Sequence, residues 1–180
     1  MDKLLALDQS SKVTGYAIFD KDGNLVSYGK ISVDGEPIDR IIELQKKVEH
    51  IIDEFKIDEV VIEDVYFSET SDNPISNVGM FKVLCFTMAG LLFMLTEKEI
   101  DYTIMTATTW KSLMNVTGKD RTSQKRNAQK VVEDEFGIKV IQDISDAVCI
   151  GGAHLKKKYN KGSQTGKECK SNEKNLMYFD

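Results

Sequence analysis

Four acidic side chains stand at positions where a folded chain does not ordinarily place an acid. Asp8 follows a run of four apolar residues and Glu63 follows a run of three, so each acid ends a predicted buried strand. Asp143 and Asp146 are three residues apart, which places them on one face of a predicted helix. Each acid also fits an ordinary role, such as an Asx turn, an edge carboxylate or a helix cap. Taken singly, none of the four identifies a site.

Together, the four acids predict a site for hard cations. Functional groups of an open sheet gather at the carboxyl ends of its strands, where Asp8 and Glu63 both lie. Carboxylates that converge there repel one another unless a cation intervenes. Oxygen-rich clusters select Mg²⁺ or Mn²⁺, which bind through a few carboxylates and a substrate phosphate. Two such ions about 4 Å apart can stabilise both the attacking and the leaving oxygen in phosphodiester hydrolysis.

Basic side chains concentrate in the second half of the chain, although the net charge of the whole is −5. The first 104 residues carry a charge of −10 and the remaining 76 carry +5. Helical spacing puts Arg126 and Lys130 on one face, and the sole tryptophan, Trp110, precedes the first basic residue of this segment. Such a segment is ordinarily a solvated helix face, but beside an acidic site it also suits contacts with a phosphate backbone. The residues concerned are Lys111, Lys119, Arg121, Lys125, Arg126 and Lys130.

The surrounding sequence predicts one α/β or α+β domain. A length of 180 residues with 41% hydrophobic and 29% charged residues is typical of a soluble domain and excludes a disordered or fibrous chain. Hydrophobic periodicity and turn residues predict strands at 4–7, 14–19, 25–33, 60–62 and 102–105. They predict helices at 37–55, at 78–97, around Trp110, at 122–136 and from 143 onward.

Composition also indicates a cytoplasmic protein without a membrane segment. The longest apolar stretch, Val83 to Leu95, is expected to be too short to span a bilayer, and no signal peptide is visible. Three distant cysteines, Cys85, Cys149 and Cys169, suit reduced thiols better than a disulfide framework or a zinc site.

Three segments resemble the RuvC family of Holliday-junction resolvases. They are Leu5 to Ala17, Val61 to Tyr66 and Asp143 to Val148, in the family's order and at its separations. The resemblance covers about residues 3–155. It implies a ribonuclease H-like fold, a mixed five-stranded sheet flanked by helices. It also implies a homodimer that nicks four-way DNA junctions with Mg²⁺ or Mn²⁺, two ions per site, and leaves 5′-phosphate and 3′-hydroxyl ends.

The resemblance also implies roles for individual residues. Asp8, Glu63, Asp143 and Asp146 match the family's metal ligands, and Lys111 and Lys125 match lysines that assist cleavage. The aromatic that wedges at the junction centre corresponds to Tyr66. Lys119, Arg121, Arg126 and Lys130 are expected to hold the DNA backbone, as are the lysines at 156–158. The chain departs from the family at Gln9-Ser10, where Pro-Gly is usual.

Several expectations complete this interpretation. A nuclease domain is predicted at 1–155 and a basic, flexible tail at 156–180, in a protein of bacterial or phage origin. The helix at 78–97 has more apolar faces than one sheet can cover, which favours a dimer. His154 lies two helical turns after Asp146, so it too is considered for the site. Two alternatives stay open: a fragment of a nucleotide-binding kinase of the sugar-kinase and actin type, and a DNA-binding homologue without catalysis.

Overall fold

The computed structural model describes residues 3–67 and 74–162 of the chain. These residues form five strands and five helices in the order β1 (Lys3–Asp8), β2 (Val13–Asp20), β3 (Leu25–Ser32), α1 (Pro37–Phe55), β4 (Glu59–Glu63), α2 (Pro74–Glu97), β5 (Asp101–Met105), α3 (Ala107–Leu113), α4 (Arg121–Phe136) and α5 (Gln142–Gly162). All five predicted strands and all five predicted helices are present, with boundaries that differ by a few residues.

The strands form one mixed sheet in the order β3-β2-β1-β4-β5. Strand β1 pairs with β2 antiparallel and with β4 parallel, and β4 pairs with β5 parallel. The hairpin from β2 to β3 turns at Asp22-Gly23, where Gly23 has a φ of 85° that suits glycine. The predicted mixed five-stranded sheet flanked by helices is therefore confirmed.

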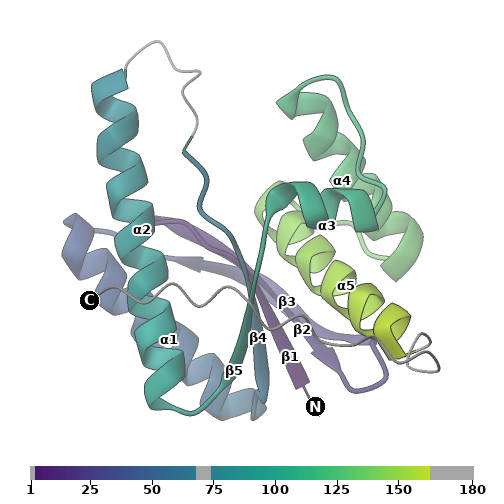
Figure 1. Cartoon of the computed structure of the whole chain (residues 1–180), viewed down its shortest axis with the longest axis horizontal. Coiled ribbons are helices and arrows are strands. Elements are labelled where there is room, and N and C mark those ends of the chain that lie inside the picture. The colour runs from purple at the N-terminus through teal and green to yellow at the C-terminus, as the bar shows by residue number, and fades with distance from the viewer. Residues whose placement is uncertain (1–2, 68–73, 163–180) are drawn as a thin grey trace, which may run out of the picture.

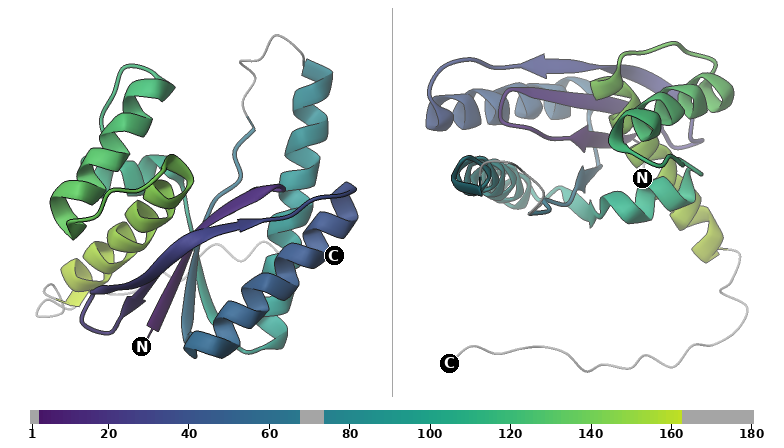
Figure 2. Two further views of the ribbon diagram at one scale, coloured as in Figure 1. Left: turned by 180° about the vertical axis from the view of Figure 1, so that it is seen from behind. Right: turned by 90° about the horizontal axis from the view of Figure 1, so that it is seen from above.

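Helices cover both faces of the sheet (Figure 1). Helices α1 and α2 lie on one face, while α3, α4 and α5 lie on the other, and the two further views separate these layers (Figure 2). Each face has its own buried cluster. Leu5, Leu7 and Val60 point toward α1 and α2, whereas Leu4 and Ala6 point toward α5. Because successive residues of β1 alternate between the two clusters, its four middle residues, 4–7, are all apolar and buried.

Helix α2 is longer than predicted. It begins at Pro74 and runs for 24 residues, so the expectation that its apolar stretch is too short to span a bilayer is wrong on length. By length and composition alone, Val78–Glu97 passes as a membrane-spanning helix. One side of the helix nevertheless belongs to the domain core, since Leu91 and Leu95 are fully buried in the cluster shared with α1.

Helix α5 continues beyond the predicted end of the domain. It runs through Gly162, so residues 156–162 are helical and do not begin a tail, and residues 163–180 lie outside the described residues together with Cys169. An ion pair supports the extension, since Lys156 Nζ lies 2.7 Å from Glu135 Oε1 of α4. The other two cysteines, Cys85 and Cys149, are free thiols, as expected.

Candidate active site

The four predicted acids come together in one pocket at the carboxyl ends of β1 and β4. Asp8 is the last residue of β1 and Glu63 the last of β4, and the parallel pairing of the two strands brings these ends side by side. Asp143 and Asp146 reach the same place from the first turns of α5. The pocket has a volume of about 770 Å³. The predicted site residues that line it are Asp8, Glu63, Asp143, Asp146, Lys111, Lys125, Arg121 and Tyr66.

Gly15 allows α5 to approach the strand ends. It is the direct partner of Asp8 in the antiparallel pairing of β1 with β2. A Cβ atom at this position would lie 1.7 Å from the carbonyl oxygen of Asp143 and 3.4 Å from the Cβ of Ala147. Any side chain at residue 15 would therefore push the first turn of α5, and Asp143 with it, away from Asp8.

Burial and mutual repulsion disturb the acids of this pocket. Burial, followed by the charge of Glu63, raises the pKa of Asp8 well above its usual range. The same two causes raise the pKa of Asp146 to about 6, although the charges of Lys111 and Lys125 act in the opposite direction. The acids thus lie close enough to oppose one another's ionisation, which is the condition that a bound cation relieves.

The donor set fits a hard divalent cation, but the side chains do not stand in a finished ligand geometry. Within residues 3–67 and 74–162, no three His, Cys, Asp or Glu side chains are gathered as a ready metal site. Asp8 and Glu63 lie close enough to affect each other, since the Glu63 charge is the second cause, after burial, of the raised pKa of Asp8.

Two hydrogen bonds from neighbouring elements hold Glu63. The indole Nε1 of Trp110, in α3, donates to Glu63 Oε1 at 2.9 Å. The amide Nε2 of Gln9 donates to the Glu63 backbone carbonyl at 2.6 Å, which ties the chain after β1 to the end of β4. Sequence reasoning assigned neither role. The signals were the single tryptophan beside Lys111 and the departure from Pro-Gly at Gln9.

The two predicted catalytic lysines face the acids from different helices. Lys111 extends from α3, where its Nζ donates to Gln124 Oε1 at 3.1 Å, and Lys125 extends from the following helix, α4. Asp120 caps helix α4, because its side chain accepts a hydrogen bond from the backbone N–H of Ser123. This hydrogen bond holds the pKa of Asp120 below its usual range. The Lys111–Gln124 bond joins α3 to α4, and the lysines of the two helices place positive charge beside the acidic pocket.

The remaining predicted DNA contacts are spread around this pocket. Tyr66 stands at its rim with 85% of its surface exposed. Arg126 and Lys130 share one helix face, as their spacing predicted, and line a neighbouring open groove of about 670 Å³. Lys119 is exposed in the connection before α4 and lines neither of these two hollows of the described chain.

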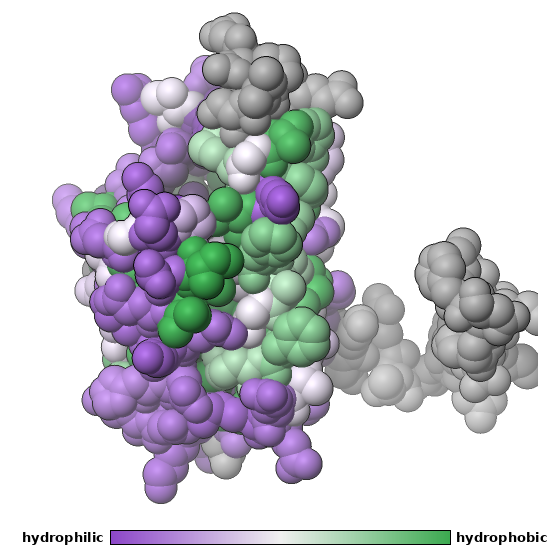
Figure 3. All heavy atoms as spheres, turned by 90° about the vertical axis from the view of Figure 1, so that its left-hand side faces the viewer, coloured by the Kyte–Doolittle hydropathy of each residue, from purple (hydrophilic) through white to green (hydrophobic). Residues whose placement is uncertain are grey.

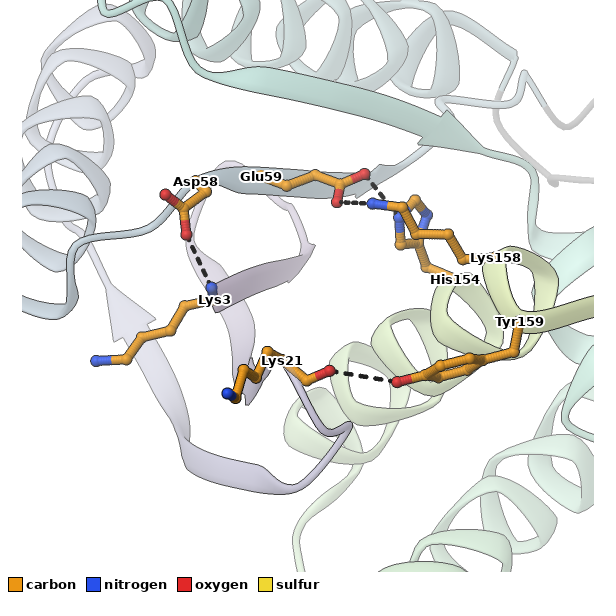
Figure 4. Close-up of polar contacts among 7 residues, drawn as sticks. All are labelled: Lys3, Lys21, Asp58, Glu59, His154, Lys158 and Tyr159. Carbon is orange, nitrogen blue, oxygen red and sulfur yellow. Dashed lines mark hydrogen bonds and ion pairs between the residues drawn. The ribbon is translucent and has the colours of Figure 1, made fainter. Parts of the chain in front are cut away.

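His154 lies midway along α5, beside the end of β4 opposite to the acids. Its Nε2 is 2.9 Å from Glu59 Oε1 at the beginning of β4, and Lys158 also bonds to the Glu59 carboxylate (Figure 4). The helical spacing from Asp146 was read correctly, but two turns carry His154 along the sheet, from one end of β4 to the other. The sequence left the role of His154 open, and the structure places it outside the acidic pocket; the lysines at 156–158 lie at this same distant end.

Comparison with known proteins agrees with this arrangement. The model of the family "Crossover junction endodeoxyribonuclease RuvC" matches residues 4–154. This chain belongs to the RuvC family. A crossover junction endodeoxyribonuclease RuvC from Sulfurovum sp. (strain NBC37-1) is 30% identical over 161 residues, covering 86% of this chain and 95% of the relative. The chain is accordingly an enzyme of the junction-resolving endonuclease class, as the sequence motifs predicted.

Solved structures of RuvC-type resolvases share the fold. Thermus thermophilus RuvC, determined in complex with a Holliday junction substrate, superposes with a TM-score of 0.68 at 13% identity and covers 89% of this chain and 96% of its own. The fowlpox virus Holliday junction resolvase superposes with a TM-score of 0.58 at 13% identity, covering 86% and 99%. At these identities the likeness establishes the ribonuclease H-like fold.

The kinase alternative finds no support. The family match covers most of the chain, and the adjacent glycines Gly151 and Gly152 stand inside α5, where they serve packing. A Cβ on Gly151 would lie 2.2 Å from the ring of Phe19, and one on Gly152 would lie 3.0 Å from Met114. These glycines let α5 pack closely on β2 and on the end of α3.

Proposed function

We propose that the acidic pocket is the centre at which this protein nicks paired strands of four-way DNA junctions. The observation that carries the proposal is the convergence of Asp8, Glu63, Asp143 and Asp146 from two strands and a helix. Lysines from α3 and α4 face the same pocket, so negative and positive groups surround one open space. That combination suits a phosphodiester, whose charge must be balanced while a metal-binding acid cluster remains nearby.

The four acids are the proposed ligands for Mg²⁺ or Mn²⁺, with two ions per site. Their fit rests on the raised pKa of Asp8 and of Asp146, since both shifts come from burial and from neighbouring carboxylates. When bound, divalent ions neutralise these acids and offset the negative charge that develops on the scissile phosphate. The protein holds the carboxylates in place through β1, β4 and α5, and the proposed products carry 5′-phosphate and 3′-hydroxyl ends.

The basic residues are proposed to divide into two groups. Lys111 and Lys125 line the acidic pocket, so we assign them to the scissile phosphate. Lys119, Arg121, Arg126 and Lys130 are assigned to the DNA backbone, with Arg126 and Lys130 in the neighbouring groove and Arg121 at the margin of the pocket. Tyr66, exposed at the rim, is assigned to stacking on a base at the junction centre.

A homodimer is proposed through the outer face of α2. Between positions 82 and 93, its exposed residues recur at the spacing of one helical stripe: Lys82, Phe86, Ala89 and Phe93. Phe93 exposes 73% of its surface and Phe86 exposes 47%. Figure 3 shows apolar side chains gathered on this side of the molecule. A second copy would cover the stripe, and two-fold symmetry would supply one site for each of two DNA strands.

Sedimentation of the full chain tests the dimer. At micromolar concentration, without DNA or detergent, we expect a dimer, and Phe93→Glu should yield a monomer with an unchanged circular dichroism spectrum. A wild-type monomer would contradict the proposed interface. Recovery of the wild type only in the detergent or membrane fraction would instead assign the stripe to lipid.

Cleavage of a synthetic four-way junction tests the proposed activity. Purified protein and Mg²⁺ should produce paired nicks that DNA ligase can seal, because ligation requires a 5′-phosphate and a 3′-hydroxyl. A linear duplex of the same sequence should remain uncut. Tight junction binding without any cleavage in Mg²⁺ or Mn²⁺ would favour the alternative of a DNA-binding homologue without catalysis. Since bacterial and phage chromosomes recombine in the cytoplasm, the proposed substrate also implies that compartment.

A further inference from the structure

The single tryptophan of the chain is buried beside the acidic pocket. Trp110 exposes only 2% of its surface and belongs to the core cluster beneath α5, together with Met105 and Met114. Its indole Nε1 is nevertheless turned toward the carboxyl end of β4, where it donates to Glu63 Oε1 at 2.9 Å. The residue therefore has one apolar side packed in the core and one polar atom committed to a proposed metal ligand.

Trp110 also contacts a proposed catalytic lysine. Lys111 Nζ lies 5.3 Å from the centroid of the indole ring, within the range of a cation–π interaction, and donates to Gln124 in α4. The indole thus lies between an acidic and a basic member of the pocket. A phenylalanine ring at this position would retain a face for Lys111, but it would lose the bond to Glu63.

The Glu63 side chain needs such a partner because its neighbours repel it. The charge of Glu63 contributes to the raised pKa of Asp8 and to that of Asp146, so the repulsion acts on Glu63 in return. Gln9 holds the Glu63 backbone carbonyl and does not contact its carboxylate, whereas Trp110 donates to the carboxylate itself. The Trp110 bond therefore selects the orientation of the carboxylate while the pocket holds no cation. Hydrogen-bond partners of metal-binding groups commonly have this role.

We propose that Trp110 is a positioning residue that holds the Glu63 carboxylate ready for a divalent cation, and that its indole reports the arrival of that cation. This inference rests on the proposed function, since it assumes that Glu63 is a metal ligand. It assigns to Trp110 no contact with DNA and no part in proton transfer.

Metal titration of Trp110→Phe tests the positioning role. At saturating protein and junction, the variant should need about 10- to 100-fold more Mg²⁺ than the wild type for half-maximal cleavage. Junction binding in the presence of a chelator should be unchanged. Met114→Leu perturbs the same core cluster at the end of α3 without touching Glu63, so it should titrate like the wild type. An unchanged Mg²⁺ requirement in Trp110→Phe would overturn the proposal.

Tryptophan fluorescence supplies a readout that needs neither cleavage nor a variant of Trp110. Because the chain has one tryptophan, a change in emission excited selectively at the indole, on adding Mg²⁺ to the free wild-type protein, must come from residue 110. We expect a saturable change that disappears in Glu63→Gln at the same Mg²⁺ concentrations. Emission that stays constant while cleavage requires Mg²⁺ would also overturn the inference. Normal cleavage by Glu63→Gln would instead contradict the proposed function itself, so the two failures are distinguishable.

Discussion

Helix α5 follows β4 from one end to the other, and the glutamate at each end of that strand meets a different environment. At the amino end, Glu59 is bonded to His154 and Lys158 from the second half of α5. At the carboxyl end, Glu63 meets Asp146 from the first turns of the same helix and Asp8 from β1. One strand and one helix thus form two different environments: a compensated acid, Glu59, which is paired with basic side chains, and a set of opposed acids, which repel one another.

The difference separates what stabilises the fold from what is left for chemistry. Buried or half-buried acids are ordinarily paired with bases, as Glu59 is, because an uncompensated charge costs free energy. The acids at the other end have lysines nearby, yet burial and mutual repulsion still raise the pKa of Asp146 to about 6. This repulsion destabilises the cation-free protein, and a bound cation would remove the cost. The experiments below change one end of the strand and use the other as a reference.

The largest expected effect comes from Asp8→Asn. Cleavage should fall below detection, because the change removes a proposed metal ligand, whereas junction binding should persist. The cation-free variant should also melt higher than the wild type, by about 2–4 °C for each kcal/mol of repulsion removed. Differential scanning calorimetry in the presence of a chelator measures this rise. If Asp8→Asn cuts normally, or is less stable than the wild type without metal, the acids at the carboxyl end of β4 do not differ from Glu59 in the way we describe.

The basic residues around the acidic pocket allow effects on the cleavage rate to be separated from effects on junction affinity. Lys111→Ala should lower the single-turnover rate at saturating protein by roughly 10²- to 10³-fold, as loss of a preorganised charge does at an active centre. Arg126→Ala should weaken junction binding and reduce the slope of its salt dependence by about one, with little change in the saturated rate. Proportional losses of rate and affinity in both variants would show one undivided phosphate-binding surface.

Gly15→Ala tests whether the close approach of α5 to the sheet brings the acids together at the carboxyl end of β4. The added Cβ cannot remain 1.7 Å from the Asp143 carbonyl oxygen, so the first turn of α5 must shift. A displacement of about 1 Å in an active centre can lower the rate by about 10²-fold, and we expect a loss of that size. Gly79→Ala is the control, because a Cβ there meets no atom within 4 Å. Wild-type cleavage by Gly15→Ala would contradict the positioning role.

The smallest expected effects are opposite pH dependences at the two ends. Because the pKa of Asp146 is raised to about 6, its ionisation destabilises the cation-free fold above that pH, and the penalty disappears as pH falls toward 4. Burial lowers the pKa of His154 despite the Glu59 charge, so its contribution is present above about pH 6.5 and is lost as pH falls through the lowered value.

Melting curves of metal-free protein between pH 5 and pH 8 measure the contributions of Asp146 and His154 to stability. Relative to the wild type, Asp146→Asn should gain most at the alkaline end. His154→Asn should lose most at that end and least under acidic conditions. Parallel curves for the two variants would show that the ends do not differ in this way.

The sequence predicted the opposed acids better than the compensated one. Asp8 and Glu63 follow apolar runs directly, so local pattern placed both at strand ends, and the Asp143 spacing placed a third acid on the helix that meets them. The Trp110–Glu63 bond joins residues 47 positions apart, and the His154–Glu59 contact joins residues 95 apart. Such pairs depend on how α3 and α5 pack on the sheet, which periodicity does not encode.

The same limit applies at two further places in α5, one left open by the sequence and one predicted wrongly. His154 shares a helical face with Asp146, but the rise of about 1.5 Å per residue carries it along the sheet and away from the pocket. The extension of α5 to Gly162 was missed because lysines at 156–158 resemble a polar tail. Two of them, Lys156 and Lys158, instead pair with acids on α4 and β4.

The same substitution at the two ends of β4 tests the central claim most directly. Glu63→Gln and Glu59→Gln each remove one charge from the same strand, and both variants can be compared with the wild type by single-turnover cleavage of a labelled four-way junction in Mg²⁺. We predict that Glu63→Gln does not cut, while Glu59→Gln cuts at the wild-type rate and melts at a lower temperature. Cleavage by Glu63→Gln, or an equal loss of cleavage in both variants, would contradict the assignment of the acidic pocket as the active centre.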